Sequence, residues 1–321
     1  MPVFITREIL DRGLQVLQNA QIAYTQFTEK RVMHTDELIS ICKDYDAVLN
    51  AGGNKMDAHF LEACSHLKVI ALHSVGYDNV DIAAATRLRI PIGNTPGVLS
   101  NATADTAFLL MLATSRKAFY MHKTIEREAW KYFEPAVNLG MELYGKTLGI
   151  FGLGNIGYEM AKRCKSAYEM KIIYHNRHNN TKAEAELGAT KVSFDELLAQ
   201  SDVLSVHTTL TPETREIFNA TAFKKMKTSA IFINTSRGGV HQEHDLTAAL
   251  QQGVIWGAGL DVTNPEPMSP GNPLLNMPNV CVLPHIGSAT FEARSEMSRL
   301  AAENIVAGLR GLPLPNQVNP F

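Results

Sequence analysis

The 321-residue chain has few cysteines, and none of them form a closely spaced CxxC pair. Scattered thiols in a chain of this size indicate a reduced, cytoplasmic protein rather than a disulfide scaffold. No apolar run reaches the ~18 residues that a membrane span needs. The N-terminus, residues 1–5, also lacks the basic and apolar regions of a signal peptide. We therefore expect a cytoplasmic protein with no membrane partner.

The chain also has no large excess of positive or negative charge. The 30 lysines and arginines nearly balance the 32 aspartates and glutamates, which leaves a formal net charge of −2. A nucleic-acid partner usually requires a strongly basic patch, so none is expected. The chain does have 45% apolar residues, enough for packed cores. Because a single core stops growing near about 250–300 residues, two domains are the better prediction.

Short apolar runs alternate with amphipathic stretches, which predicts mostly parallel sheets flanked by helices. In the first part we expect strands at 2–6, 47–50, 69–72 and 90–92, and a helix at 8–18. Amphipathic segments follow at 102–116 and 120–130. The second part predicts strands at 146–151, 171–175, 203–207, 230–234, 255–260 and 280–283, and helices at 155–169 and 195–200. A final helix at 292–309 is expected to pack back on the first domain, which both chain ends then build.

The strongest local motif is a glycine turn after the strand expected at 146–151. Gly152 permits a tight turn, Gly154 lets the backbone approach a pyrophosphate, and Gly157 lets the helix and strand pack closely. The free N–H groups and the dipole of the following helix then face the anion. In this context the motif predicts a dinucleotide-binding site.

The strand after that turn bears on the choice between NAD and NADP. An NAD site usually carries an acidic residue about 20 residues on, which accepts from the ribose 2′-OH. Here the strand ends in His175-Asn176-Arg177, and no acidic residue follows before Glu184. A guanidinium pairs with a 2′-phosphate in bidentate fashion. NADP(H) is therefore favoured. In the alternative, Arg177 is solvated and NAD(H) binds without an acidic partner.

Three charged residues each follow an apolar strand of the second part, namely Arg237, Glu266 and His285. Ligands of open α/β sheets bind at the carboxyl ends of strands, so the three side chains are expected to converge. A histidine suits proton donation to a ketone during hydride transfer. A glutamate bonded to the other ring nitrogen fixes the tautomer and favours imidazolium. An arginine holds a carboxylate and a polarised ketone oxygen. This predicts a reductase of 2-oxo acids.

These motifs resemble the D-isomer-specific 2-hydroxyacid dehydrogenase family, and within it the glyoxylate/hydroxypyruvate reductases. The similar stretches cover nearly the whole chain: 74–81, 94–99, 148–157, 234–239, 259–267 and 284–290. The resemblance implies two Rossmann-like α/β domains with the active site in the interdomain cleft. The first, flavodoxin-like and discontinuous, would bind substrate and cover residues 1–100 and 288–321. The dinucleotide-binding domain would cover residues 101–287.

The resemblance also implies individual roles. Arg237 would bind substrate, His285 would be the general acid/base, and Glu266 its partner. Ser74, Val75 and Gly76 would cradle the substrate carboxylate, with backbone N–H groups at the last two. Cofactor contacts are expected at Thr103, Gly152, Leu153, Gly154, Asn155, Ile156, Gly157, His175, Asn176, Arg177, Thr208, Pro212, Thr235, Ser236, Asp261, His285 and Gly287. The expected partners are a small 2-oxo or 2-hydroxy acid and a second copy, paired through the cofactor domain.

Several alternatives remain open at this point. A short-form phosphoglycerate dehydrogenase and a non-enzymatic, NAD(H)-sensing corepressor-like protein share the motifs. A formate dehydrogenase is disfavoured, because that branch lacks an equivalent of Glu266. His241 and His244 have metal-pair spacing, but they are interpreted as a solvated helix start, so no metal is expected. Trp130 and Trp256 are interpreted as packing residues, and Cys281 as a small core residue. In the alternative, Trp130 reaches a substrate across a dimer.

Overall fold

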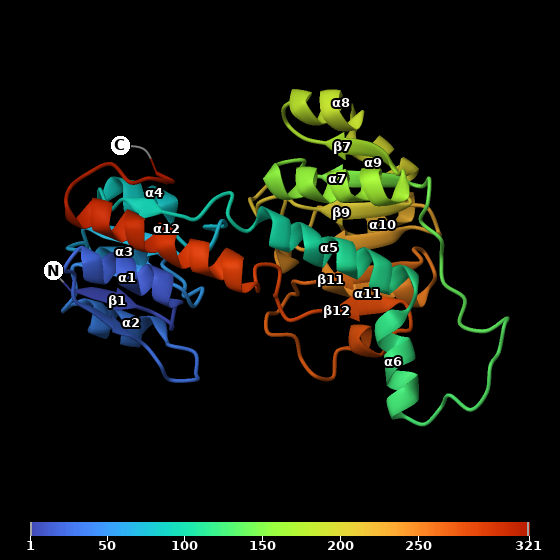
Figure 1. Ribbon diagram of the computed structural model, residues 1–321, viewed down its shortest axis with the longest axis horizontal. Coiled ribbons are helices and arrows are strands. Elements are labelled where there is room, and N and C mark those ends of the chain that lie inside the picture. The colour runs from blue at the N-terminus through green and yellow to red at the C-terminus, as the bar shows by residue number, and fades with distance from the viewer. Residues whose placement is uncertain (1, 320) are drawn as a thin grey trace. The chain divides into compact units, whose positions relative to one another are not determined.

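The computed structural model describes residues 2–319 and 321. The chain divides into two compact units, Met1–Leu99 with Ala289–Phe321 and Ser100–Ser288. The chain therefore passes from the first unit to the second and later returns, and both chain ends belong to the first (Figure 1).

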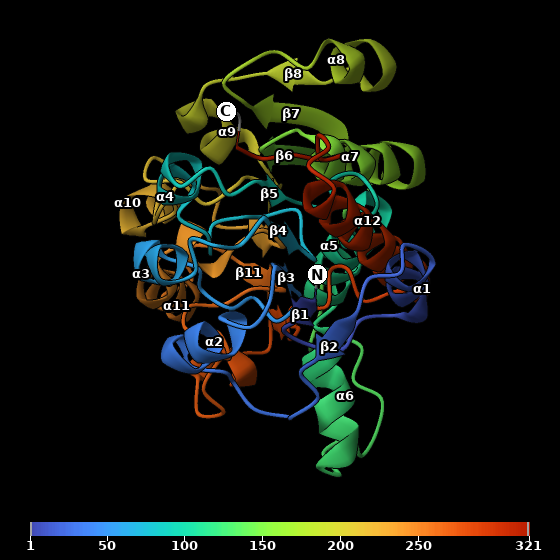
Figure 2. The ribbon, with the colours of Figure 1, turned by 90° about the vertical axis from the view of Figure 1, so that its left-hand side faces the viewer.

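The first unit is a parallel sheet with helices on both faces. Figure 2 shows α1 and α12 on one side of the strands and α2, α3 and α4 on the other. Within the described residues its five strands follow the order β2-β1-β3-β4-β5. The strands are β1 (Val3–Ile5), β2 (Tyr24–Gln26), β3 (Ala47–Asn50), β4 (Val69–Leu72) and β5 (Ile92–Gly93). The helices are α1 (Asp11–Asn19), α2 (Thr35–Cys42), α3 (Ala58–Ala63), α4 (Ile82–Arg87) and α12 (Phe291–Leu309).

The second unit is a larger sheet of the same kind. Across its described residues seven strands follow the order β12-β11-β10-β9-β6-β7-β8, and the paired strands are parallel. They are β6 (Thr147–Phe151), β7 (Lys171–His175), β8 (Thr190–Lys191), β9 (Val203–Val206), β10 (Ile231–Asn234), β11 (Gly257–Leu260) and β12 (Val280–Val282). The helices are α5 (Ser100–Ser115), α6 (Ala118–Glu126), α7 (Asn155–Tyr168), α8 (Thr181–Leu187), α9 (Phe194–Gln200), α10 (Ala220–Lys225), α11 (Glu243–Gln251) and two 3₁₀ turns, η1 (Gly238–Val240) and η2 (Pro273–Asn276).

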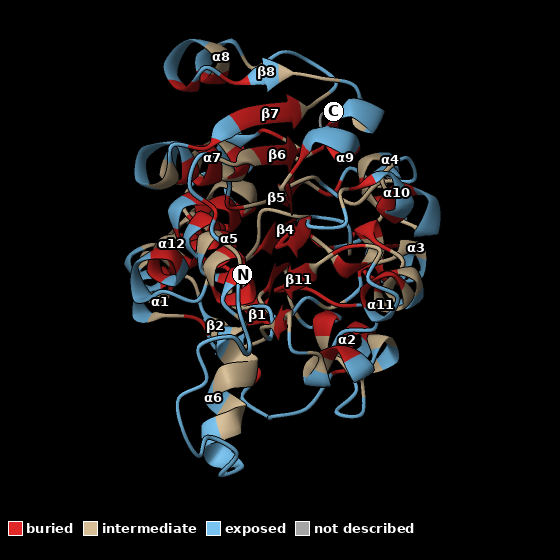
Figure 3. Cartoon of the chain, turned by 90° about the vertical axis from the view of Figure 1, so that its right-hand side faces the viewer, coloured by how far each residue is buried: buried red, intermediate tan, exposed pale blue. Residues whose placement is uncertain are grey.

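Alternating side chains of the central strands enter different cores, which explains why these strands are continuous apolar runs. On β10, Ile231 and Ile233 join the core beneath α5 and α7, whereas Phe232 joins the core beneath α9, α10 and α11. A parallel sheet covered on both faces requires such strands. Figure 3 shows the result, with buried strands and helices whose outer faces are exposed. No helix of the described chain is both long and apolar enough to cross a membrane.

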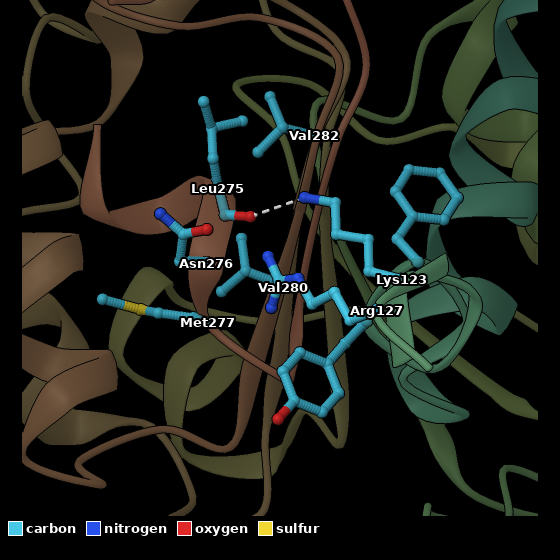
Figure 4. Close-up of a pocket in the computed structure, with 9 residues that line it drawn as sticks. Lys123, Arg127, Leu275, Asn276, Met277, Val280 and Val282 are labelled. Carbon is cyan, nitrogen blue, oxygen red and sulfur yellow. Dashed lines mark hydrogen bonds between the residues drawn. The ribbon is translucent and has the colours of Figure 1, made fainter. Parts of the chain in front are cut away.

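The predicted helix at 120–130 is wrong at both ends. The helix α6 spans Ala118–Glu126, and Trp130 lies beyond it with 69% of its surface exposed. The packing role predicted for Trp130 is therefore also wrong. Lys123 anchors α6 to the rest of the unit, because its Nζ donates to the carbonyl oxygen of Leu275 at 2.9 Å (Figure 4). The segment after α6 runs out from the second unit as an extended loop (Figure 1).

Candidate active site

The three reaction residues follow three neighbouring strands. Arg237 comes after β10, Glu266 after β11 and His285 after β12, and these strands are adjacent in the sheet. His285 Nδ1 lies 2.5 Å from Glu266 Oε1. The histidine side chain is 44% exposed and that of the glutamate 43%, so a ligand can reach both. With Nδ1 engaged by the carboxylate, Nε2 is the ring nitrogen left to exchange a proton with a substrate.

The charges at this site act on Glu266 in opposite directions. Burial by itself raises the pKa of the carboxyl group, but the hydrogen bond to His285 and the charges of His285 and Arg237 outweigh it. The net result is a pKa below the usual value, so Glu266 is a carboxylate at neutral pH. The attraction to Arg237 also indicates that all three side chains share one electrostatic environment.

The backbone holds His285 in an unfavourable conformation. Its φ is +54°, in the left-handed region that costs a non-glycine residue about 1–3 kcal/mol. Asp261 stabilises this turn: its carbonyl accepts from His285 N at 2.9 Å, and its carboxylate accepts from Ile286 N and Gly287 N, each at 2.7 Å. Thr103 Oγ1 donates to the carbonyl of Gly287 at 3.1 Å. Asp261 is 1% exposed, and its carboxylate positions the His285 loop; the cofactor contact expected at Asp261 stays a prediction.

The glycine turn at the start of α7 fits the pyrophosphate of a dinucleotide. Gly152 has a φ of +95°, and a Cβ there would lie 2.8 Å from backbone atoms of His207 and Thr208. A Cβ on Gly154, in contrast, would meet open space. Gly154 is the N-cap of α7, and no side chain of the described residues caps this helix start. Open space above uncapped N–H groups is the arrangement that an anion requires.

Asn176 and Asn180 brace this turn from the end of β7. Asn176 Oδ1 accepts from Leu153 N at 2.6 Å, and Asn176 Nδ2 donates to the Leu153 carbonyl at 3.1 Å. Asn180 Nδ2 donates to the same carbonyl at 2.9 Å. The side-chain amide of Asn176 therefore holds the glycine turn, and the cofactor contact expected at this residue stays a prediction. The bonds from Asn180 have no counterpart in any sequence motif.

The other two residues after β7 point to different surroundings. His175 stacks on Phe151 at 5.7 Å, and its Nδ1 lies 3.0 Å from the carbonyl of Val192. It is therefore part of an aromatic cluster, and the cofactor contact expected at His175 stays a prediction. Arg177 is exposed, and Lys191 Nζ donates to its carbonyl at 3.3 Å. Two cations thus lie at the edge of the sheet where an NAD site usually has an acid.

The remaining predicted cofactor contacts lie on loops that follow β9 and β10. Thr235 and Ser236 are buried, at 8% and 9% exposure, and Ser236 Oγ donates to Asn234 Oδ1 at 2.8 Å. Thr208 is half-buried and Pro212 is exposed. These loops begin at the same edge of the sheet as the glycine turn, because all these strands are parallel.

The predicted carboxylate loop lies in the first unit, directly after β4. Its carbonyl groups are engaged: Asn94 Nδ2 donates to Val75 O at 2.8 Å, Thr95 N to Ser74 O at 2.9 Å, and Ser74 Oγ to Gly76 O at 2.7 Å. These bonds fix the loop. The cradle of N–H groups at Val75 and Gly76 stays a prediction.

The interpretation of His241 as part of a solvated helix start is wrong. His241 is completely buried, whereas His244 is exposed as expected. No group of three or more potential metal ligands occurs among the described residues. Cys281 is 1% exposed and lies in a core, as predicted.

Another histidine, His207, supports the site without any signal in the sequence. It follows β9, and its Nε2 lies 2.8 Å from Ser205 Oγ. Burial lowers the pKa of His207 to about 3, so its ring is neutral. Its backbone lies against Gly152, so it supports the glycine turn. No periodicity or motif distinguishes it from an ordinary strand-end residue.

The fold and these strand-end residues define a nicotinamide-dependent dehydrogenase, and comparison with known proteins gives its family. Residues 108–287 match the family model described as D-isomer specific 2-hydroxyacid dehydrogenase, NAD binding domain. The chain belongs to this family. It is an NAD(P)-dependent 2-hydroxyacid dehydrogenase, an enzyme class that reduces 2-oxo acids.

Individual relatives cover the whole chain. A glyoxylate reductase of Thermococcus litoralis is 42% identical over 99% of this chain and 96% of its own. One of Korarchaeum cryptofilum is 40% identical over 99% and 95%. Among solved structures, an NADPH-dependent glyoxylate/hydroxypyruvate reductase of Sinorhizobium meliloti in complex with NADP and malonate has a TM-score of 0.85 and 30% identity, covering 99% of this chain and 96% of that one.

Proposed function

We propose that this enzyme reduces a small 2-oxo acid of the glyoxylate or hydroxypyruvate type to the D-2-hydroxy acid, with NADPH preferred. The observation that carries the proposal is the 2.5 Å contact between His285 Nδ1 and Glu266 Oε1, with the charge of Arg237 acting on the same carboxylate. The names of the relatives, glyoxylate reductases, support the substrate class.

Each side chain has a distinct task in this proposal. When bound, the nicotinamide supplies the hydride that reduces the ketone carbon. His285 donates a proton from Nε2 to the ketone oxygen, where negative charge develops. Glu266 holds the ring through Nδ1 and stabilises its protonated form. Arg237 binds the substrate carboxylate and ketone oxygen. The loop of Ser74, Val75 and Gly76 contributes to carboxylate binding.

The preference for NADPH rests on the end of β7. Arg177 is exposed there, Lys191 Nζ donates to its carbonyl, and the residues that follow β7 carry no carboxylate before Glu184. A guanidinium pairs with a 2′-phosphate through charge-assisted hydrogen bonds. The Sinorhizobium relative is NADPH-dependent and its structure contains NADP, which supports the same cofactor here.

The test is a steady-state panel of 2-oxo acids, run with NADPH and NADH in parallel. Glyoxylate and hydroxypyruvate with NADPH are expected to give the highest kcat/KM. Preferred turnover of the phosphorylated 2-oxo acid used by phosphoglycerate dehydrogenases would replace the proposed substrate. Equal use of both cofactors would refute the NADPH preference and leave the substrate class standing.

We also propose that the enzyme is a homodimer formed through the second unit. The segment 127–144, the exposed arm, carries a concentration of large apolar side chains at the surface. They are Trp130, Tyr132, Phe133, Val137, Leu139 and Tyr144, with exposures from 48% to 85%. Large exposed apolar side chains that gather on a monomer's surface often mark a site of protein–protein contact. Sedimentation should give twice the chain mass, and replacing Trp130 and Phe133 with serine should shift it towards the monomer.

A further inference from the structure

His241 lies four residues after Arg237, and the proposed chemistry does not use it. The ring is completely buried, and it packs edge-on against Phe232 at 5.8 Å. Its backbone pairs with that of Phe218 in a parallel β-bridge, which fixes where His241 lies in the fold. Buried polar groups are usually hydrogen-bonded, so a fully buried histidine is expected to form a hydrogen bond through its ring.

The Nδ1 atom of His241 forms a hydrogen bond with the side chain of Asn234, the last residue of β10. Asn234 Oδ1 accepts from Ser236 N at 2.9 Å, and Nδ2 donates to the carbonyl of Arg237 at 2.9 Å. A backbone N–H only donates and a carbonyl only accepts, so these two bonds fix the orientation of the amide. Its second N–H then points to His241 Nδ1 at 3.0 Å.

The tautomer of His241 follows from this geometry. Nδ1 must be an acceptor, so the ring proton lies on Nε2. Burial lowers the pKa of His241 to about 4, and the ring is therefore neutral at physiological pH. Nε2 has no hydrogen-bond partner among the described residues. The ring therefore offers its Nδ1 to Asn234 as an acceptor.

The acceptor completes a set of bonds that shapes the turn presenting Arg237. One amide, that of Asn234, binds the N–H of Ser236, the carbonyl of Arg237 and the ring of His241. An apolar residue at 241 would leave one amide N–H buried without an acceptor. The amide would then be held by its bonds to Ser236 and Arg237 alone, and the turn would be fixed less rigidly.

We propose that His241 is a positioning residue: by accepting from Asn234 it holds the turn that presents Arg237 and so determines how well the substrate carboxylate binds. This inference rests on the substrate-binding role proposed for Arg237.

The test compares two substitutions that differ in one property. His241→Leu keeps an apolar volume in the core but removes the acceptor. His241→Asn restores an acceptor oxygen near the place of Nδ1. For His241→Leu we expect the KM for the 2-oxo acid to rise roughly 10- to 100-fold, since small misplacements of a positioning group cost up to about 10²-fold. The KM for NADPH should stay within about twofold, and His241→Asn should recover most of the loss.

A readout independent of activity examines the hydrogen bond itself. Nitrogen-15 NMR should show the ring of His241, whose signals are assigned by their absence from His241→Leu, with its proton on Nε2 and an acceptor Nδ1 that does not titrate between pH 5 and pH 9, the range about neutrality in which an ordinary histidine titrates. A proton on Nδ1 of His241 would overturn the proposal, because such a nitrogen cannot accept from Asn234.

A core variant separates positioning from general loss of stability. Leu246→Ala removes a fully buried side chain of α11 from the same core region, and it is compared with His241→Leu at temperatures of equal fractional unfolding. A similar rise in substrate KM for both variants would overturn the role of His241. Failure of the wild type to reduce any 2-oxo acid would instead overturn the proposed function, and the two failures are therefore distinguishable.

Discussion

Two regions at the same edge of the large sheet meet their ligands in opposite ways. The glycine turn after β6 offers backbone: Gly154 has open space above it, and no described side chain caps α7. The loops after β10, β11 and β12 offer side chains instead. There the backbone N–H and carbonyl groups form hydrogen bonds with the side chains of Asn234 and Asp261. We call these the cofactor side and the reaction side.

The difference between the two sides has a physical basis. A pyrophosphate is bound by backbone N–H groups that must approach it closely, so glycines, which have no side chain, occupy the turn. Proton transfer and carboxylate binding need groups with a chosen charge and direction, so the backbone is fixed to aim them. Substitutions on the reaction side should therefore lower kcat or substrate affinity, and those on the cofactor side should affect stability and cofactor KM.

The largest effect is expected for His285→Ala. Loss of a positioned general acid should lower kcat by about 10²–10⁴, with little change in the KM for NADPH. Stopped-flow measurement of NADPH oxidation checks this, with thermal unfolding as the control for folding. Near-normal turnover would remove His285 from the reaction side.

The next effect is expected for Gly152→Ala on the cofactor side. A left-handed φ costs an alanine about 1–2 kcal/mol, and the added Cβ would also press on the backbone of His207. Unfolding in urea should show that the free energy of unfolding falls by more than this conformational cost, and the KM for both cofactors should rise.

Gly253→Ala is the matched control, because Gly253 has a φ of +68° and open space around it. For Gly253→Ala the free energy of unfolding should fall only by the cost of placing an alanine at a left-handed φ. Equal losses in the two variants would mean that close approach at Gly152 is unimportant.

The two sides also differ in how far the sequence predicts them. The strand β10, the glycine turn and the alternation of strands and helices follow from local patterns, since a covered parallel strand must be apolar. The contact of Glu266 with His285 follows only from the order of strands β11 and β12. That order is a long-range property that local patterns do not contain, so the sequence predicted only that side chains at the carboxyl ends of the strands converge.

The support behind each side could not be predicted. The position of Asn176 favours a ligand contact, but its amide binds the backbone of Leu153. The position of His241 favours a solvated helix start, but the residue lies in the core. In both cases the partner is 7 to 23 residues away, and no periodicity records which way a polar side chain turns.

A smaller effect is expected for Glu266→Gln, and it concerns pH. Burial acting alone would raise the pKa of Glu266, but its hydrogen bond and attraction to His285 lower it, so the group is negative throughout the neutral range. A negative partner favours the protonated ring that reduction requires. The reduction rate should fall as pH rises, and in Glu266→Gln this fall should begin at lower pH than in the wild type.

Rate profiles for reduction between pH 5 and pH 10, a range around the neutral titration of histidine, measure this shift. The acidic plateau of the variant provides the internal control, since there the ring is protonated with or without its partner. An unchanged alkaline limb would show that the charge of Glu266 does not act on the proton donor.

The smallest effect is expected for Arg177→Ala, which tests whether a side chain also contributes on the cofactor side. Hydrogen bonds to charged groups contribute about 1.5–3 kcal/mol, so the preference for NADPH over NADH should fall about tenfold or more, with kcat unchanged. Asn176→Ala is the companion variant: it loosens the turn at Leu153 and should raise the KM for both cofactors alike. If Arg177→Ala also changed both equally, the 2′-phosphate would be recognised elsewhere, and the cofactor side would act through backbone alone.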